Sequence, residues 1–415
     1  TLTVQGVPFF SPPTLSFLEN TQLIRIDETI ERVEAVRGGT GALFGNGQPG
    51  LTVNFVQKEG GRDFEGLVKA SVTDFGDLRG DLLLSGPLGE NTSFMVGGYY
   101  ASGNGIRDPR FTAEKGGQIT GNIRHDLDKG SILVFARYLN DRGQWLLPIP
   151  VIRDGDKVRQ FGNIDLGSGA LAGPETRLST LPDGTRANLA DGRGAKLVNL
   201  GTNFDYEVGD GLQLRYRASY LKGDADTTGL VPASTAMTAN AYAASLGSTV
   251  GSLTYVNGGQ PVAGTQQVIR AGTWIVRKQI ENFANDLAVE WESGRNKLTV
   301  GAYFADGKVR RELARSVPDR VLRRFGGPNT CAFGRSCVSP FQFLLHHRQL
   351  VFVTGTDARG MHPDGRVAIP AILRLQLQHS LQRSRIDIRK HDFCNAGRFR
   401  PLQHCIPVVV EFFGV

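Results

Sequence analysis

Apolar and polar residues alternate with a period of two along most of the first three quarters of the chain. In the clearest case, residues 198–208, Val198 and Leu200 share one face, while Asn199 and Asp205 share the other. Successive side chains of a β-strand point to opposite faces, so this pattern predicts a strand with an apolar and a polar side. The same alternation predicts about nine strands in all. They cover residues 64–73, 79–86, 93–101, 118–127, 131–139, 198–208, 212–220, 285–292 and 298–304.

The connections between these strands are alternately short and long, except that the first outer connection, at Gly76 and Asp77, is unusually short. The long ones cover residues 103–115, 142–195 and 223–279. Outer-membrane barrels have tight turns at the periplasmic end and extended loops at the outer end. A soluble β-sandwich shows the same alternation along its strands, but it has no reason to collect its long loops at one end. The pattern therefore favours an all-β transmembrane barrel. This barrel is incomplete, because bacterial barrels have an even number of strands.

The N-terminal residues follow a different pattern. Ile30, Val33 and Val36 recur at helical spacing. Asp27 precedes them, and aspartate commonly caps the N-terminus of a helix. A glycine-rich turn and an alternating strand over residues 51–58 follow. The sequence therefore predicts a small α/β domain in front of the barrel.

The glycine-rich turn matches the pattern G-x-G-x-x-G at Gly45, Gly47 and Gly50. A dinucleotide-binding loop with this pattern leaves a strand and opens a helix. Here a helix is predicted before the loop and a strand after it, and Pro49 removes one backbone donor. The glycines are therefore interpreted as a tight turn between a helix and a strand.

Four phrases of the N-terminal segment form a recognisable set: VQGVP at residues 4–8, IERVEAVRG at 30–38, LFG at 43–45 and GLTVN at 50–54. With these phrases the segment resembles the plug domain of TonB-dependent outer-membrane receptors. Gln5 stands where that family usually has aspartate, and Leu51 replaces the second glycine of a usual pair. The resemblance spans about residues 1–61, and it implies active uptake of a scarce ligand, most often a ferric siderophore, with energy supplied through TonB.

The resemblance also implies functional residues. Arg32, Glu34 and Arg37 match family positions whose charges latch the plug to the barrel wall. The plug turn is assigned to Gly38, Gly45, Gly47 and Gly50. Ligand contacts between the plug apex and the outer loops are assigned to Phe9, Phe10, Asn46, Gln48 and Trp145.

Trp145 has two interpretations from the sequence. It lies near Pro148 and Pro150 in a predicted outer loop, where an aromatic ring beside prolines could line a ligand vestibule. An aromatic side chain in such a loop also commonly packs within the loop or anchors it at the membrane interface.

The last hundred residues differ from the rest of the chain. Residues 316–415 carry 14 basic and 6 acidic residues, a net charge of +8, so the first 315 residues carry −1 of the total +7. No basic and aromatic residues are interleaved there on a recognisable module, so nucleic-acid binding is not inferred. This tail is interpreted as foreign to the barrel, for instance through a shifted reading frame. A divergent continuation is the alternative, which the alternating Leu373, Leu375 and Leu377 support.

All four cysteines lie in this tail, and three interpretations of them are open. His391, Cys394, His404 and Cys405 could supply zinc ligands, although no C-x-x-C pair frames such a site. Cys331 and Cys337 could form a disulfide in an oxidising compartment. The neutral interpretation is that the thiols are unpaired, and no metal or other cofactor is expected.

The expected organisation has three parts. Residues 1–61 form the C-terminal part of a plug domain, residues 62–315 the N-terminal portion of a barrel, and residues 316–415 the tail of uncertain origin. No signal-peptide pattern or TonB-contacting segment is seen at Thr1, and no run of eighteen apolar residues predicts a transmembrane helix. A chain with only these parts is expected not to transport by itself.

The sequence predicts no enzyme. His125 is the only histidine in the first 315 residues, and no nucleophile and base are placed to act with it. The expected location is the outer membrane of a Gram-negative bacterium. The expected partners are the TonB energy-coupling complex, outer-membrane lipid and a small-molecule ligand such as a ferric siderophore. The rival interpretation is a passive porin-like or structural barrel without energy coupling.

Overall fold

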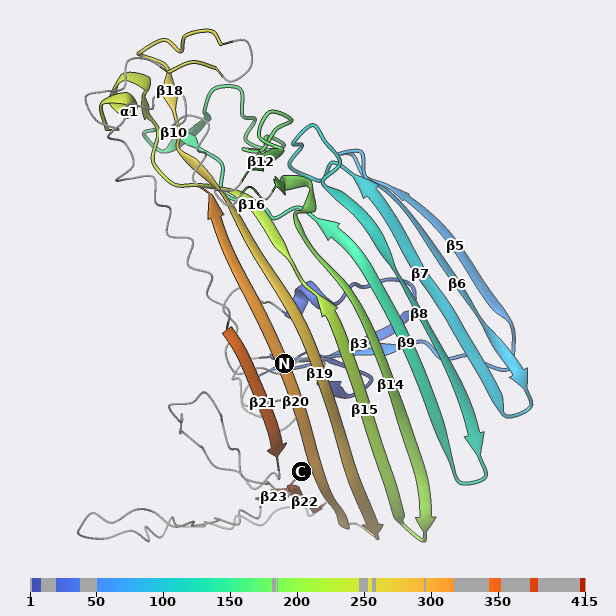
Figure 1. Cartoon of the computed structure of the whole chain (residues 1–415). Helices are drawn as coiled ribbons and strands as arrows, with labels where there is room; N and C mark the ends of the chain where they lie inside the picture. Colours follow the sequence, from blue (N-terminus) through green and yellow to red (C-terminus); the bar gives the residue numbers. More distant parts are fainter. Residues whose placement is uncertain are drawn as a thin grey trace, which may run out of the picture.

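The computed structural model contains two main sheets, of four and thirteen strands (Figure 1). The long strands of the larger sheet lie side by side, and the smaller N-terminal sheet lies against one of its faces. No helix in the described residues is long and apolar enough to cross a bilayer. The structure describes residues 2–8, 20–37, 51–180, 184, 186–245, 253–255, 259–294, 296–316, 343–351, 374–379 and 411–414.

The N-terminal sheet has the strand order β2-β1-β4-β3. β1 runs parallel to β4, and the other pairs are antiparallel. Gln5 and Gly6 turn the chain between β1 and β2 with φ angles of 52° and 82°. The strands are β1 (Leu2–Val4), β2 (Val7–Pro8), β3 (Ile30–Arg37) and β4 (Leu51–Gln57).

The helix predicted after Asp27 is wrong, because Ile30–Arg37 forms the strand β3. Asp27 caps a turn instead, and its Oδ1 accepts a hydrogen bond of 3.0 Å from the backbone N–H of Thr29. β3 then pairs along its length with β4, with Val33 opposite Phe55. Pairing with a distant strand thus overrides the local helical spacing, and the β-branched residues of this segment suit a strand.

All nine strands predicted from the alternation are confirmed in the larger sheet. Each is antiparallel to its neighbours, and most are longer than predicted, because the backbone pairing continues beyond the apolar pattern. Their order in the sheet follows the chain. They are β5 (Glu65–Val72), β6 (Leu78–Gly89), β7 (Thr92–Gly103), β8 (Glu114–Leu127), β9 (Gly130–Gly143), β14 (Arg193–Gly209), β15 (Leu212–Asp224), β19 (Ala271–Ser293) and β20 (Asn296–Ser316).

The two faces of the larger sheet differ as the alternation predicts. On β14, Val198 is 40% exposed and Leu200 46% exposed, while Asn199 between them is fully buried. We call the side of Val198 and Leu200 the outward face and the side of Asn199 the inner face. Apolar residues of the N-terminal sheet, including Val4 and Phe55, pack against inner-face residues such as Leu197 in one buried cluster.

Short turns lie at one end of the long strands, and the long loops lie at the other (Figure 1). The connection between β5 and β6, residues 73–77, is short although it lies at the loop end. The loop end is the outer end if the sheet crosses an outer membrane. The loops contain short elements that the alternation did not predict, because they are too short to show a period. They are β10 (Val151–Asp154), β11 (Lys157–Gln160), β12 (Leu178–Thr180), β13 (Arg186–Asn188), η3 (Leu189–Asp191), β16 (Thr227–Pro232), β17 (Met237–Thr238), α1 (Ala239–Ser245) and β18 (Gln267–Val268).

Three further strands follow β20: β21 (Phe343–Val351), β22 (Arg374–His379) and β23 (Glu411–Gly414). Both β21 and β22 pair antiparallel with β20, at different registers, and β23 runs parallel to β22. The alternating leucines predicted as a strand fall largely in β22. The four cysteines, together with His391 and His404, lie outside the described residues.

Candidate functional site

A short segment tied to the inner face of the larger sheet is the main candidate site. Residues 21–28, which we call the strap, run from the 3-10 turn η1 (Asn20–Leu23) toward β3. The strap has no regular partner strand for most of its length, so its backbone carbonyls need other hydrogen-bond donors. Side chains of the sheet supply several of them, as described below.

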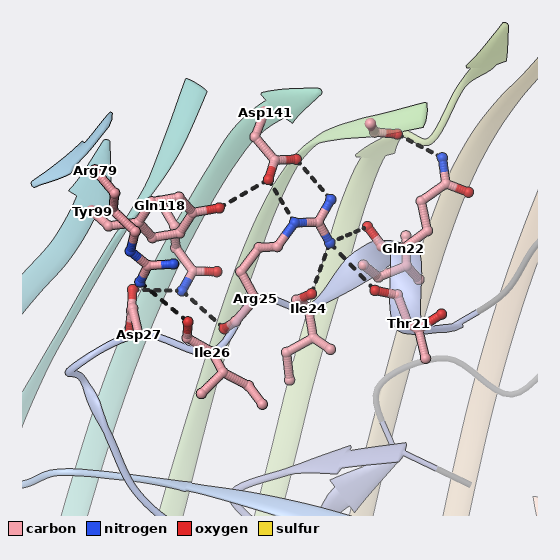
Figure 2. A network of polar contacts seen from close by, with 12 residues as sticks. Thr21, Gln22, Ile24, Arg25, Ile26, Asp27, Arg79, Tyr99, Gln118 and Asp141 are labelled. Carbon is pink, nitrogen blue, oxygen red and sulfur yellow. Dashed lines mark hydrogen bonds and ion pairs between the residues drawn. The ribbon is translucent and has the colours of Figure 1, made fainter. Parts of the chain in front are cut away.

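Arg25 is the centre of the strap (Figure 2). Its Nε and Nη2 donate hydrogen bonds of 2.6 and 2.9 Å to the two carboxylate oxygens of Asp141 on β9. Its Nη1 lies 2.8 Å from the carbonyl oxygen of Ile24. Tyr99 on β7 donates from its hydroxyl to the same Asp141, at 2.9 Å. The two hydrogen bonds between Arg25 and Asp141 fix the relative orientation of the two side chains as well as their distance.

A second group of contacts holds the strap at Asp27. Gln118 on β8 donates a hydrogen bond of 2.9 Å from its amide to Asp27 Oδ2. Arg79 on β6 donates to the carbonyl oxygen of Ile26 at 3.3 Å (Figure 2). The Arg79 guanidinium also lies 4.1 Å from the centre of the Tyr99 ring, a cation–π contact that connects this group to the Arg25 group.

The other end of the strap is held at Gln22. Its amide nitrogen donates to the carbonyl oxygens of Gly194 and Asp226, at 2.7 and 2.6 Å. Its amide oxygen accepts a hydrogen bond of 3.0 Å from Nζ of Lys278 on β19. Lys278 is only 1% exposed, and it also lies 3.3 Å from the Thr227 hydroxyl. A buried ammonium needs such acceptors, because burial without them is costly.

A polar chamber lies between the strap and the loop end of β5 to β9. It has a volume of about 480 Å³. Acidic and basic side chains both line it, as do hydroxyl groups. Residues used below are Gln22 and Arg25 of the strap and Arg79, Tyr99, Asp141 and Arg193 of the sheet.

Only some of the predicted latch residues lie near the larger sheet. Arg32 and Glu34 line a second cavity, of about 350 Å³, together with wall residues that include Asp205 and Arg217. Their ion pair with each other is 2.9 Å long, and Arg37 is exposed at the end of β3. A latch role for these three residues therefore stays a prediction.

Glu34 is held as a carboxylate by its neighbours on the N-terminal sheet. It accepts a hydrogen bond of 2.9 Å from the Asn54 amide in addition to its pair with Arg32. The Asn54 hydrogen bond and then the Arg32 contact lower the pKa of Glu34 below its ordinary value.

Other residues of the N-terminal sheet region do contact the wall. Glu59 pairs with Arg124 of β8 at 2.9 Å. The Asn122 amide donates to the carbonyl oxygen of Lys58 at 2.7 Å. These contacts lie near the short-turn end of the strands, whereas the strap lies nearer the loop end. The N-terminal region is thus held to the wall at two levels.

Among the residues assigned to the turn and to ligand contact, only Trp145 is described. Phe9, Phe10, Gly38, Gly45, Asn46, Gly47, Gln48 and Gly50 lie outside the described residues. Trp145 packs beside Gly229 of β16: a methyl group on Gly229 would lie 2.4 Å from its Cε3 atom. The Leu147 side chain also packs beside Gly229. The geometry matches the loop-packing interpretation, and the ligand contact stays a prediction.

The sequence interpretation missed the strap. Gln22 and Arg25 show no period and lie outside the phrases that resemble the plug family. The available signal lay in the strands, where Asp81, Gln118 and Asp141 occupy inner-face positions that a partner must satisfy. Among the described residues, no three histidine, cysteine, aspartate or glutamate side chains gather to hold a metal ion.

The chain is similar in sequence to a receptor for an iron-carrying ligand. It is 38% identical over 61 residues to the ferripyoverdine receptor of Pseudomonas aeruginosa, a stretch that covers 15% of this chain and 8% of that protein. A short part of this chain is thus similar in sequence to a short part of one outer-membrane receptor. No family model matches the chain.

Solved structures of receptors match parts of this chain with TM-scores below 0.5. The siderophore receptor PiuA from Acinetobacter baumannii is 13% identical, with a TM-score of 0.49, over 91% of this chain and 45% of that chain. The ferripyoverdine receptor of the P. aeruginosa outer membrane is 16% identical, with a TM-score of 0.45, over 70% and 35%. The chain thus spans about a third to a half of these receptors.

We call the N-terminal sheet with the strap the plug, and the larger sheet the barrel wall. The location expected from the sequence, the outer membrane, would place the outward face toward lipid and the loops toward the exterior.

Proposed function

We propose that this chain is part of a receptor that takes up a scarce ligand across the outer membrane, with energy supplied through TonB. The observation that carries the proposal is the strap, which holds a folded plug against the inner wall by paired charges and hydrogen bonds. Such contacts are strong when complete and costly when one partner is lost. A plug held in this way blocks passive flow and needs energy to move.

We propose a ferric siderophore as the ligand class and the chamber as its place of contact. The matched relative is a receptor for ferripyoverdine, which supports this class. The chamber volume of about 480 Å³ lies within the range of sites for small organic molecules. Arg79 and Arg193 line it beside the Tyr99 ring, a combination that suits an anionic, partly aromatic ligand.

The test is uptake of radiolabelled ferric siderophores by cells that carry the complete receptor gene, with and without TonB. We expect uptake that depends on TonB and saturates with ligand. Arg193→Gln in the chamber should weaken binding by about tenfold, as for loss of one charged contact. The matched control, Lys129→Gln, removes a cation from a short turn at the opposite end, and it should leave binding unchanged.

The same experiment separates the rival function. A porin-like barrel would admit small solutes of many kinds without TonB and without saturation. We expect neither, because the plug packs on the inner wall through an apolar cluster as well as the strap. We further propose that this chain by itself does not transport, and TonB-dependent growth on an iron source supported by this chain alone would contradict that proposal.

A further inference from the structure

An apolar pocket lies among the long loops, next to the polar chamber. It has a volume of about 70 Å³. Its walls come from the connection between β7 and β8, the connection between β9 and β14, and β16. Most of its lining side chains are apolar, in contrast to those of the chamber. The apolar ones used below are Phe111, Leu146, Leu171, Ala172, Leu189 and Leu230.

The pocket is built into a packed cluster of the loops. Phe111, Leu189 and Leu230 are each at most 9% exposed and belong to one buried apolar cluster, and Leu171 and Ala172 pack against it. An apolar cavity that stays empty inside such a cluster lowers stability, because the side chains around it lose contacts. The fold nevertheless keeps this cavity, with a small alanine at its edge, so an occupant from outside the chain would restore the missing contacts.

The larger polar side chains of the lining are engaged with the backbone. Nη1 of Arg107 donates to the carbonyl oxygens of Leu166 and Gly169, at 2.8 and 3.3 Å. The amide oxygen of Gln144 accepts a hydrogen bond of 3.0 Å from the backbone N–H of Arg107, and its amide nitrogen donates to the Arg107 carbonyl oxygen. A ligand group with polar atoms would lose its hydrogen bonds to water here without replacing them from these two side chains. The pocket therefore selects a group without polar atoms.

The volume of the pocket distinguishes an aliphatic chain from an aromatic ring. An apolar cavity of about 150 Å³ in a protein binds benzene. The pocket, at about 70 Å³, has less than half of that volume. Since a water molecule takes about 30 Å³ in the liquid, the pocket holds about two groups of that size. The end of an aliphatic chain fits this space, and a ring does not.

The pocket adjoins both solvent and the chamber. Leu146 in its lining is 60% exposed, so the apolar lining reaches the surface of the loops. Gln144 lines the pocket and also the chamber, so the two cavities are neighbours. One ligand can therefore occupy both, with a polar part in the chamber and an apolar part in the pocket.

We propose that this pocket binds the end of a short aliphatic chain, and that the ligand of the receptor is a siderophore with an acyl tail beside its iron-binding head. The proposal rests on the proposed function, which places the head in the chamber. Each methylene group that leaves water for an apolar site strengthens binding by about fourfold. Two such groups in the pocket therefore favour an acylated ligand over the same ligand without a tail by about tenfold or more.

The test measures binding of hexanoate that carries a trifluoromethyl group at its tail end. Fluorine NMR follows the probe with the whole chain in nanodiscs, and nanodiscs without protein give the background. We expect saturable binding, and Ala172→Leu, which fills the pocket, should weaken it at least about tenfold. The matched control is Ala244→Leu, the same change at an exposed position of α1, and it should bind as the unaltered chain does.

Two further probes identify the chemistry of the tail. Propionate with the same trifluoromethyl end should bind at least about tenfold more weakly than the hexanoate, because it buries fewer methylene groups. Benzoate with a trifluoromethyl group opposite its carboxylate should also bind at least about tenfold more weakly, because its ring exceeds the pocket. Equal binding of either probe, equal binding by Ala172→Leu, or no binding above background would each overturn the proposal.

The comparison of the three probes uses the unaltered chain, so it decides the proposal even where Ala172→Leu does not fold, which circular dichroism checks. The measurement needs neither iron nor TonB. Uptake of ferric siderophores without preferential binding of the hexanoate would refute only the tail pocket. Preferential binding of the hexanoate without TonB-dependent uptake would refute the uptake proposal and leave the aliphatic pocket.

Discussion

The Arg25 guanidinium of the plug and the Asp141 carboxylate of β9 are joined by two hydrogen bonds of 2.6 and 2.9 Å. Their side chains are 25% and 9% exposed. This pair joins the plug to the wall at the floor of the chamber. Its contribution can be measured directly, because both residues have their main polar contacts in the same small network.

Asp141→Asn should loosen the strap. The substitution removes a charge and one acceptor from Arg25 and disturbs the bond from Tyr99, so we expect a loss of about 2 kcal/mol in the free energy of unfolding. The midpoint of urea unfolding and the rate of protease cleavage within residues 21–28 measure it. The control is Glu175→Gln, which breaks the exposed pair with Arg110 and should cost less than about 1 kcal/mol. Equal losses of stability in the two variants would show that the Arg25–Asp141 pair contributes no more than an exposed ion pair.

Gln22→Leu should release the other end of the strap. The variant loses the donor to two backbone carbonyls and one acceptor of the buried Lys278, and the loss of a hydrogen-bond partner is costly for a buried cation. We expect about 2 to 4 kcal/mol of destabilisation and faster hydrogen exchange of the backbone amides near residue 22. Thr21→Ala, one residue away at an exposed position, is the control and should change neither.

Gly229→Ala should displace Trp145. The added methyl group would lie 2.4 Å from the indole ring, which must move, at a cost of about 1 to 3 kcal/mol. A shift in tryptophan fluorescence and a lower unfolding temperature are the expected results. In a Trp145→Ala variant, Gly229→Ala should cost much less stability. An equal loss of stability in that variant would show that the contact with Trp145 is not its cause.

Trp145→Phe tests the ligand prediction for the same residue. If Trp145 only packs within the loop, the smaller ring keeps most of the apolar contact, and ligand binding should change by less than about threefold. A loss of tenfold or more with an unchanged unfolding temperature would instead assign Trp145 to the ligand.

Acid should weaken the contact of β3 with β4 at Glu34. Its pKa lies below the ordinary value of 4.5, because the Asn54 hydrogen bond and the Arg32 contact favour the charged form. A carboxylate with a lowered pKa stabilises the fold above its ordinary pKa, and this stabilisation is lost as the pH falls through its folded value. The 48% exposure of the side chain limits the size of the effect. The protection factors of the β3 amides, which correct for the intrinsic pH dependence of exchange, should fall on acidification, and Glu34→Gln should flatten that fall.

The sequence predicts the wall well because its signal is local. Val198 and Leu200 lie on the apolar side of β14, and the alternation continues along this long strand. The period alone therefore predicts which side chains face outward. β3 was predicted wrongly, because Ile30, Val33 and Val36 fit a helical period and the pairing that overrides it comes from the distant β4.

The strap could not be predicted for a related reason. Gln22, Arg25 and Asp27 have no period, and their partners are far away in the chain, so only the folded wall gives these residues their role.

The contact between Gln22 and Lys278 also sets an order of assembly. These residues are 256 positions apart, so the bond can form only after β19 has joined the wall. Contacts of such high sequence separation form late, because the entropy of closing the intervening chain is lost before they contribute. The strap residues leave the ribosome before the wall strands but are among the last to reach their final positions. An assembling chain must therefore carry its plug undocked until the wall beside it is built.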